Sequence, residues 1–407
     1  MIALAWRNLW RKRWRSIVTL LAVALVVYLT LFNFGLMAAA KNSMYSNLTE
    51  AVGHVQVRVK DHRDKREFSS LLVRDAGAIE AEINKIFPDV ELVKALQVGG
   101  LIEGNEQRSR GGMLIGLDQP PDIKAEFLKD YLIAGEFPAK DDVESIVLGR
   151  KLAESLKVGV GDTVYVYTFD TEGYGASAYT VKGLVNVFGS EAIAFSSLLA
   201  VQELAAPDAV NRVELHFTDL KTFGDDSSVP ALRDQLKVSL GETNSVETWK
   251  EVEPGFAGYL DIIDPINLIF TAIFFVLAGL VVANTIYLSI IERVREFGVM
   301  MAVGLKRRKV FWLVILESLW LCVTGAVIGG LLGAWHINYL SKVGFKIPGM
   351  GEAFANVGVP SVFYPGLTPS YVIYTIIFVV LTGIIAAIVP AITAGRLQPV
   401  EAMRFTV

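Results

Sequence analysis

The stretch that decides the fold is IERVREFGVMMAVGLKRRKVF, residues 291–311, which lies between two long apolar runs. Residues 265–291 contain no charged side chain, and residues 310–340 contain only Glu317. At a rise of about 1.5 Å per residue, each run can cross a hydrocarbon core of about 30 Å. A short basic loop between two spanning helices is expected on the cytoplasmic side of the membrane. Its basic side chains are Arg293, Arg295, Lys306, Arg307, Arg308 and Lys309, against the acidic Glu292 and Glu296.

The middle of this loop has the periodicity of an amphipathic helix. Val294, Phe297, Gly298, Met301 and Leu305 recur at helical spacing and fall on one face. We therefore predict a short helix held against the inner surface of the membrane. The same charge pattern also fits a topology signal that binds no partner, and periodicity alone does not separate the two interpretations.

A resemblance to a known family bears on that choice. Asn284-Thr285, followed by ERVREFGVMMAVGLKRR at residues 292–308, resembles the signature of the FtsX-like ABC-transporter permeases. This family includes the MacB efflux permeases and the lipoprotein-releasing LolC and LolE permeases. The chain departs from the pattern at Phe297, where the family has Ile, and at Met301, where Arg or Lys is common. Neither change alters the helix length or the glycine positions.

The resemblance implies that this segment is a coupling helix, which docks onto a separate ATPase subunit. The residues that it assigns to the coupling contact are Glu292, Arg293, Arg295, Glu296, Phe297, Gly298, Met301, Ala302, Gly304, Arg307 and Arg308.

The composition favours an integral membrane protein, because 53% of the 407 residues are hydrophobic. The net charge of −4 hides a separation along the chain. Residues 41–264 hold 23 Lys+Arg and 37 Asp+Glu, which gives −14, and the remainder holds 15 and 5, which gives +10. The only cysteine is Cys322, inside an apolar run, so one chain can form neither a disulfide framework nor a cysteine-based metal site.

The N-terminal region predicts an interfacial helix followed by a span. Tryptophans and arginines each recur every four residues within residues 1–15, which suits a helix lying in an anionic interface, although a positive-inside flank is the alternative. Residues 16–40 are uncharged and longer than the apolar core of about 7–15 residues in a signal peptide. We expect an uncleaved first transmembrane helix there. The repeated side chains are Trp6, Trp10 and Trp14 beside Arg7, Arg11 and Arg15.

Residues 41–264 read as a folded α+β domain outside the cytoplasm. Residues 54–60 and 212–217 alternate apolar and polar side chains, which predicts strands. Between them, Asp75 is placed to cap a helix that Pro88 ends.

Part of this domain also resembles the periplasmic core domain of MacB-like and LolC-like permeases. The resemblance lies in residues 149–164, which read as helix, glycine turn and strand, and in the strand expected at residues 179–187. It implies an inserted subdomain near residues 120–208.

The third apolar run carries two features of its own. Gly325, Gly329 and Gly333 form a small-x-x-x-small face, which suits either packing within the chain or a subunit interface. Glu317 lies about two turns inside the run, where an ionised group should face protein or water. We expect it to make an interior contact with the basic loop.

The expected fold class is an α-helical membrane protein with four transmembrane helices and a large α+β extracytoplasmic domain, MacB-like, between the first and second helices. The tail PAITAGRLQPVEAMR at residues 390–404 resembles the ending of the family, so both termini are expected in the cytoplasm of a bacterial inner-membrane protein. The expected segments are an interfacial amphipathic helix (1–15), the first span (16–40), the extracytoplasmic domain (41–264), the second span (265–291), the coupling helix (292–309), the third span (310–340), an extracytoplasmic loop (341–370), the fourth span (371–394) and a cytoplasmic tail (395–407).

Several kinds of chemistry have no support in the sequence. There is no Gly-x-x-x-x-Gly-Lys-[Ser/Thr] motif, so ATP and magnesium are expected in a partner subunit, and no catalytic or cofactor site is predicted in this chain. The four histidines form no His-Glu-x-x-His motif, and no metal site is predicted. The acidic soluble block argues against binding to nucleic acid.

The leading hypothesis is therefore a permease subunit of an ABC transporter, which pairs with a second permease subunit of the same or another kind, with two ATPase subunits and with membrane lipids. Four spans with few polar side chains make a poor aqueous pore, which favours a mechanotransmission role or lateral extraction of a lipid-like substrate from the outer leaflet. Lipoprotein release is the first choice. Two alternatives stay open: MacB-like efflux with a periplasmic adaptor, and an FtsX-like regulator of a cell-wall hydrolase that transports nothing.

Overall fold

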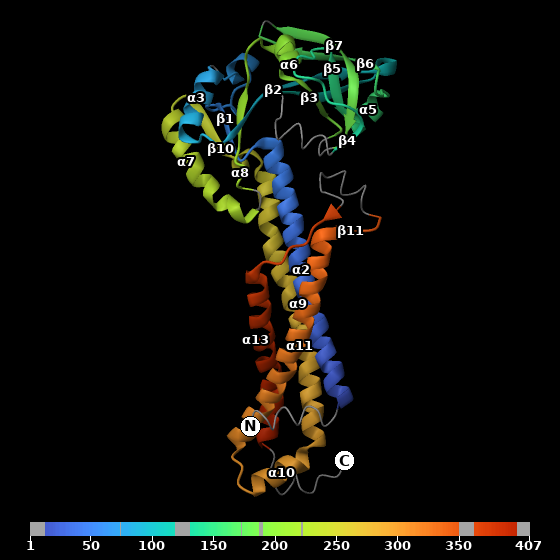
Figure 1. Cartoon of the computed structure of the whole chain (residues 1–407), viewed down its shortest axis with the longest axis vertical. Coiled ribbons are helices and arrows are strands. Elements are labelled where there is room, and N and C mark those ends of the chain that lie inside the picture. Colours follow the sequence, from blue (N-terminus) through green and yellow to red (C-terminus); the bar gives the residue numbers. More distant parts are fainter. Residues whose placement is uncertain are drawn as a thin grey trace. The chain divides into compact units, whose positions relative to one another are not determined.

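A computed structural model describes residues 13–73, 75–118, 131–171, 173–186, 190–220, 223–349 and 362–396 (Figure 1). Two compact units make up the chain, a helical one around Asp261–Phe345 and a mixed one within Ala40–Leu260. The expected interfacial helix and cytoplasmic tail fall mostly on residues 1–12 and 397–407, which lie outside the described residues.

Four helices are long and apolar enough to cross a membrane. Two of them extend well beyond the uncharged runs, α2 to Val52 and α9 back to Pro254, because the polar sequences that flank these runs also continue the helix. A short helix joins the second spanning helix to the third. The helices are α2 (Arg13–Val52), α9 (Pro254–Glu292), α10 (Val294–Ala302), α11 (Arg307–Val343) and α13 (Pro369–Arg396).

The core of the helical unit is apolar and draws on all of its helices. α11 lies against α13, where the Ser318 hydroxyl donates to the Gly383 carbonyl at 2.7 Å. On another face, α11 crosses α2 at its three glycines, which are all buried. A Cβ atom on Gly329 would stand 2.2 Å from the Ala24 carbonyl oxygen. The glycine face therefore contacts the chain's own first helix, because only a bare backbone can come this close.

The mixed unit contains one ten-stranded sheet. In one part, β1 lies between β9 and β10, and all of these pairings are antiparallel. The first half of the long strand β2 pairs with β9. Helices α3 and α7 belong to the same end of this unit (Figure 1). The elements are β1 (Val55–Val59), α3 (Ala76–Ile86), β2 (Glu91–Glu103), β9 (Arg212–His216), α7 (Val229–Leu240), β10 (Asn244–Thr248) and α8 (Trp249–Val252), with the short helices η2 (Phe68–Leu71), η3 (Asn105–Gln107) and η4 (Phe223–Ser228).

The second half of β2 belongs to a closed ring of strands, β2-β3-β8-β5-β7-β6, because β6 pairs with both β7 and β2. Buried and exposed residues alternate along β6, so one face of this strand lies in the core of the ring. The ring of strands in the subdomain expected near residues 120–208 therefore closes only with β2 and β3, which both precede residue 120. The further elements are β3 (Ser109–Leu117), β4 (Leu132–Gly135), β5 (Ser145–Gly149), α5 (Arg150–Leu156), β6 (Thr163–Phe169), β7 (Tyr174–Val185), β8 (Ile193–Ser197), α6 (Leu198–Ala205), β11 (Phe345–Lys346) and β12 (Val362–Phe363).

Candidate functional site

The segment singled out by the sequence forms α10, which lies across one end of the helical unit (Figure 1). The helical path breaks at Arg293, with φ −112° and ψ 12°, and α10 then runs to Ala302. Gly304 has a φ of +100°, a conformation that favours glycine and lets the chain turn into α11. Periodicity thus predicted the short helix, but the helix ends at Ala302, three residues before the expected end at Leu305.

One face of α10 is buried inside the chain itself. Val294, Phe297 and Gly298 are buried, and Phe297 has no exposed surface. Its ring belongs to the apolar core of the helical unit, together with Val310 and Leu313 of α11. This corrects the expected arrangement, because a side chain that is fully packed inside its own chain cannot also form the surface that a partner binds.

An ion pair anchors the start of α10 to α11. The Arg293 Nη1 donates to Glu317 Oε1 at 3.0 Å, and the Arg293 Nε donates to Glu296 Oε2 at 3.2 Å. The guanidinium group also lies 5.1 Å from the centre of the Phe297 ring. Glu317 is only 4% exposed, so its charge is compensated inside the protein, as a buried carboxylate requires. The contact expected between Glu317 and the basic loop is present.

A second ion pair ties α2 to the end of α9. Both terminal nitrogens of Arg15 donate to the carboxylate of Glu292, one of them at 3.0 Å. This two-pronged geometry fixes the orientation of both groups. Glu292, the last residue of α9, is therefore held to α2. The next residue, Arg293, holds the start of α10 to α11.

The opposite face of α10 and the turn after it are exposed. Arg295, Val299, Ala302, Val303 and Gly304 are all exposed, and Val303 is 84% exposed. The basic row Lys306, Arg307, Arg308 and Lys309 is exposed as well. The predicted site residues thus divide into two sets with different surroundings. The anchoring set is Arg293, Glu296, Phe297, Gly298 and Glu317; the exposed set is Arg295, Ala302, Gly304, Arg307 and Arg308, while Met301 is half-buried and Glu292 binds Arg15.

Sequence reasoning missed Val299 and Val303 as members of this exposed face. The signal was available, because the two valines stand four residues apart, away from the stripe that contains Phe297. Together with Arg295 they form an exposed surface that is both apolar and basic.

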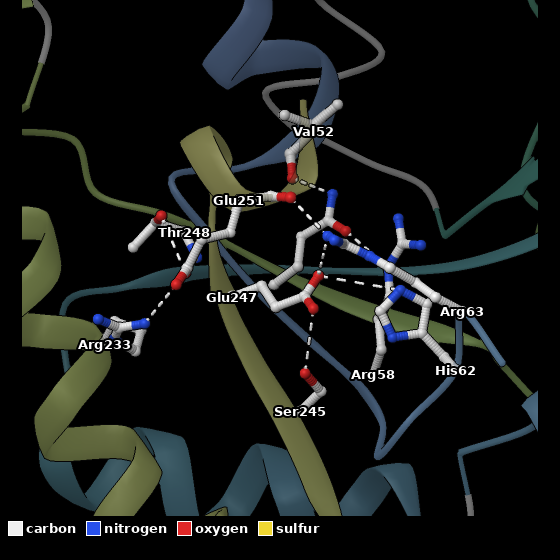
Figure 2. Close-up of polar contacts among 10 residues, drawn as sticks. Val52, Arg58, His62, Arg63, Arg233, Ser245, Glu247, Thr248 and Glu251 are labelled. Atoms are coloured by element: carbon white, nitrogen blue, oxygen red, sulfur yellow. Dashed lines mark hydrogen bonds and ion pairs between the residues drawn. The ribbon is translucent and has the colours of Figure 1, made fainter. Parts of the chain in front are cut away.

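Figure 2 shows a second polar cluster, at the place in the mixed unit where α2 ends and α8 begins. β1 follows the end of α2, and β10 precedes the start of α8. The two strands pair with each other, and Val55 lies opposite Thr248. The Gln56 side chain donates to the Val52 carbonyl, the last residue of α2. Arg63 donates to the Glu251 carbonyl in α8 and to the Glu247 carboxylate at 3.3 Å.

The start of α8 has its own cap within this cluster. The Thr248 N–H donates to the Glu251 carboxylate at 2.7 Å, which completes a capping box, and Arg233 Nη1 donates to the same carboxylate at 2.7 Å. Burial by itself raises the pKa of Glu251, but the bonds from Thr248 and Arg233 outweigh it and hold the pKa below its usual value. The cluster therefore fixes both helix ends to the same pair of strands.

Ionisable groups also lie inside the sheet of the mixed unit. Glu214 is fully buried and pairs with Arg212 at 2.8 Å and with His216 at 3.6 Å. The Phe217 N–H donates to His54 Nδ1 at 3.2 Å, and burial lowers the pKa of His54 to about 4. Within the described ranges, no group of three or more His, Cys, Asp and Glu side chains is arranged to hold a metal ion.

Two family profiles match the chain. The FtsX-like permease C-terminal profile matches residues 268–399, and the MacB-like periplasmic core domain profile matches residues 16–248.

Three curated relatives show how far the similarity extends. The transmembrane protein LolC of the lipoprotein-releasing system of Xylella fastidiosa is 22% identical, over 96% of this chain and 94% of its own length. A Staphylococcus haemolyticus protein named as hemin transport system permease HrtB is 23% identical, over 98% of each chain. The ABC transporter permease YvrN of Bacillus subtilis is 33% identical over 124 residues, which are 30% of this chain and 26% of that protein.

Proposed function

The chain belongs to the FtsX-like ABC-transporter permeases that carry a MacB-like periplasmic core domain, and on this premise we propose that it couples ATP hydrolysis by a separate ATPase subunit to movement of that domain. The observation that carries the proposal is the division of α10 into two faces. One face is packed into the chain's own helices, and the other presents Arg295 and Val299, with Val303 exposed in the turn directly after the helix. A helix built in this way can receive a push on one face and pass it on through the other.

The path of transmission in this proposal runs through Arg293. A displacement of α10 changes the position of the Arg293 guanidinium, which is bonded to Glu317 of α11. Glu317 is buried, so its carboxylate cannot exchange this partner for water without a large loss of free energy. In the proposal, α11 therefore follows α10, and the end of α9 follows through the break at Arg293.

The proposal includes an orientation in the cytoplasmic membrane. We place α10, the basic row and both termini in the cytoplasm, and residues 41–264 outside it, because the basic residues flank the spans while the large block is acidic. A reporter that is active only outside the cytoplasm should work at residue 150 and fail after residue 300.

The cargo that we propose is a lipoprotein or another molecule that partitions into the membrane. LolC and HrtB match this chain over almost their whole lengths, and the name of one refers to lipoproteins and that of the other to hemin. Both are amphipathic cargoes. MacB-like efflux with a periplasmic adaptor is the second candidate, and an FtsX-like regulator of a cell-wall hydrolase is the third. Mass spectrometry of the purified complex distinguishes them by what is retained: a lipoprotein or lipid, an adaptor, or a hydrolase.

The coupling proposal is tested by a charge on the exposed face of α10. Val303→Asp should abolish co-purification of the ATPase subunit, since an unpaired carboxylate in a packed contact costs several kcal/mol. Val238→Asp is the matched control, because Val238 is 88% exposed and Val303 84%. Retention of the ATPase by Val303→Asp at the wild-type level would reject the proposed docking face.

A further inference from the structure

A groove of about 590 Å³ lies between α2 and α11 in the helical unit. One face of each helix forms its walls, and most of the side chains there are large, apolar and exposed. All of them lie within the two apolar runs, so in a membrane the groove opens toward lipid. The lining residues are Leu21, Ala24, Leu25 and Tyr28 of α2 and Ile328, Leu332, Trp335 and His336 of α11.

His336 gives one end of this groove a polar group that its neighbours hold in place. The Tyr28 hydroxyl lies 2.7 Å from Nδ1 of His336. The imidazole is also nearly parallel to the rings of Tyr28 and Phe32, with 5.7 and 5.8 Å between the ring centres. Within the described part of the chain, His336 makes no further hydrogen bond, so Nε2 makes none.

The chemistry of this pair makes Nε2 a donor. A phenol is a better hydrogen-bond donor than acceptor, so we assign the hydrogen between the two rings to the Tyr28 oxygen. The neutral imidazole of His336 then carries its own hydrogen on Nε2. The apolar walls of the groove offer this N–H no acceptor. Because an unpaired N–H is unfavourable in a membrane, an acceptor is expected from a bound molecule.

The ion pairs near α10 set the depth of this polar end. They join α2, α9 and α11 at one level. Tyr28 lies 13 residues beyond Arg15, and His336 lies 19 residues beyond Glu317. These separations correspond to about 20 and 28 Å along the two helices. In a hydrocarbon core about 30 Å thick, the pair therefore falls in the leaflet farther from α10, near the level where the headgroups begin.

The charge beyond this end of the groove is positive. Residues 318–351 contain Lys342 and Lys346 and no acidic residue. Lys342 follows His336 by six residues, or about 9 Å along α11. It is exposed and makes no ion pair within the described ranges. An anionic headgroup is therefore favoured at this end of the groove.

We propose that the groove between α2 and α11 binds one anionic phospholipid. Its phosphate accepts a hydrogen bond from Nε2 of His336 and faces the ammonium group of Lys342, while one acyl chain lies along Leu25 and Leu332. The groove has the polarity of such a lipid, since its polar end is toward the headgroups and its apolar walls are toward the middle of the membrane. The inference goes beyond the proposed function, because this lipid stays bound and is not moved, and it uses only the membrane position of the helices.

A second groove of the helical unit lacks such a polar end. It measures about 490 Å³ and is lined by side chains of α2, α11 and α13. Its one polar lining residue is Thr375, whose hydroxyl donates to the Tyr371 carbonyl of the same helix at 2.8 Å. An acyl chain in this second groove gains no headgroup bond, so we expect it to exchange freely with the surrounding lipid. The second groove therefore serves as the control.

The test is native mass spectrometry of the full-length permease with its ATPase, delipidated in detergent and titrated with phosphatidylglycerol. We expect one tightly bound phosphatidylglycerol per permease chain. His336→Phe, which keeps an aromatic ring beside Tyr28 and Phe32, should weaken its binding by about 10-fold. His336→Gln, which keeps an N–H donor, should restore most of the affinity. Ala334→Phe in the second groove is the matched control and should leave the affinity unchanged.

Two further measurements address the phosphate. Lys342→Gln should weaken the binding of phosphatidylglycerol by roughly 5-fold at low salt. Diacylglycerol with the same acyl chains lacks the phosphate and should bind to the wild-type protein about 10-fold more weakly. Equal binding of the two lipids would overturn the phosphate contact.

Three results would overturn the site itself. The first is an equal affinity for phosphatidylglycerol in the wild type and in His336→Phe. The second is a loss of affinity in Ala334→Phe alone, because the lipid would then occupy the second groove. The third is a wild-type complex that binds no lipid while the ATPase is still present, and that result would leave the coupling proposal standing.

Discussion

The ion-pair cluster at the start of α10 and the one at the start of α8 each hold a helix end, and they differ in how the bonds are shared. At the start of α10, a single arginine makes the contact: Arg293 donates hydrogen bonds to both Glu317 and Glu296. At α8, the contact is divided among several side chains. Arg63 bonds Glu247 and the Glu251 carbonyl, while Arg233 and Thr248 bond the Glu251 carboxylate (Figure 2).

Burial also separates the two clusters. The Arg293 and Glu317 side chains are 12% and 5% exposed, whereas Arg63 is 58% exposed. If one partner in the first cluster is removed, the other is left as a buried and unpaired charge. In the second cluster, water takes the place of the removed partner. We infer that the contact at α10 is concentrated in one arginine side chain, whereas the contact at α8 is distributed over several side chains.

The largest expected effect is at Glu317. Glu317→Ala should destabilise the helical unit by about 3–5 kcal/mol, because it leaves Arg293 buried without its main partner. The measurement is the thermal unfolding of the purified protein in detergent. The double variant Arg293→Met/Glu317→Leu, which removes both charges, should recover most of the loss, and a loss in the double variant as large as in Glu317→Ala would argue against a concentrated ion pair.

The next effect is a dependence on pH in the mixed unit. His54 has a folded pKa of about 4 against an ordinary value of 6.5, so its contribution to stability is complete above pH 6.5 and is lost as the pH falls toward 4. The loss is on the order of 3 kcal/mol. Hydrogen exchange at β1 and β9 in the full-length protein, corrected for the intrinsic pH dependence, measures it. His54→Asn should flatten this part of the profile, and an equally steep profile in that variant would assign the loss to other groups.

A smaller effect is expected where α11 crosses α2. Gly329→Leu should destabilise the helical unit by about 1–3 kcal/mol or more, since a Cβ there meets the Ala24 backbone. Gly330→Leu is the control, because a Cβ on Gly330 meets open space. Equal melting temperatures for the two variants would show that the crossing is not closely packed.

The smallest effect is expected at Arg63. Arg63→Ala should cost less than about 1 kcal/mol, because its side chain is largely exposed and its partners keep other bonds. Thermal unfolding of this variant beside Glu317→Ala compares the two clusters directly. A loss at Arg63 that matched the loss at Glu317 would remove the distinction between distributed and concentrated contacts.

The sequence predicted most of the helical unit, because its signals are local. Uncharged runs of sufficient length identify spans, and the spacing of Val294, Phe297 and Met301 identifies α10. Periodicity could not tell what the apolar stripe packs against, since an amphipathic helix buries the same face in its own chain or in a partner. The structure places Phe297 inside the chain, which moves the proposed docking surface to Arg295, Val299 and Val303.

Features that depend on distant residues were not predictable in the same way. The strand ring closes through pairing of β2 with β6, and the cluster in Figure 2 joins residues almost 200 positions apart. A local rule also failed at Asp75, which precedes α3 as expected but has a φ of +55° and makes no side-chain capping bond. Capping needs an extended backbone at that position, and the tertiary fold does not provide it.

The exposed face of α10 is the place where we expect the ATPase to bind, and the coupling proposal depends on it. A photoreactive amino acid at Val303, in the intact complex, tests this directly, with the same group at the equally exposed Val238 as control. We predict a covalent adduct between the permease and the ATPase subunit from position 303 and none from position 238. An ATPase that is bound to the complex but gives no adduct at position 303 would contradict the proposed docking face.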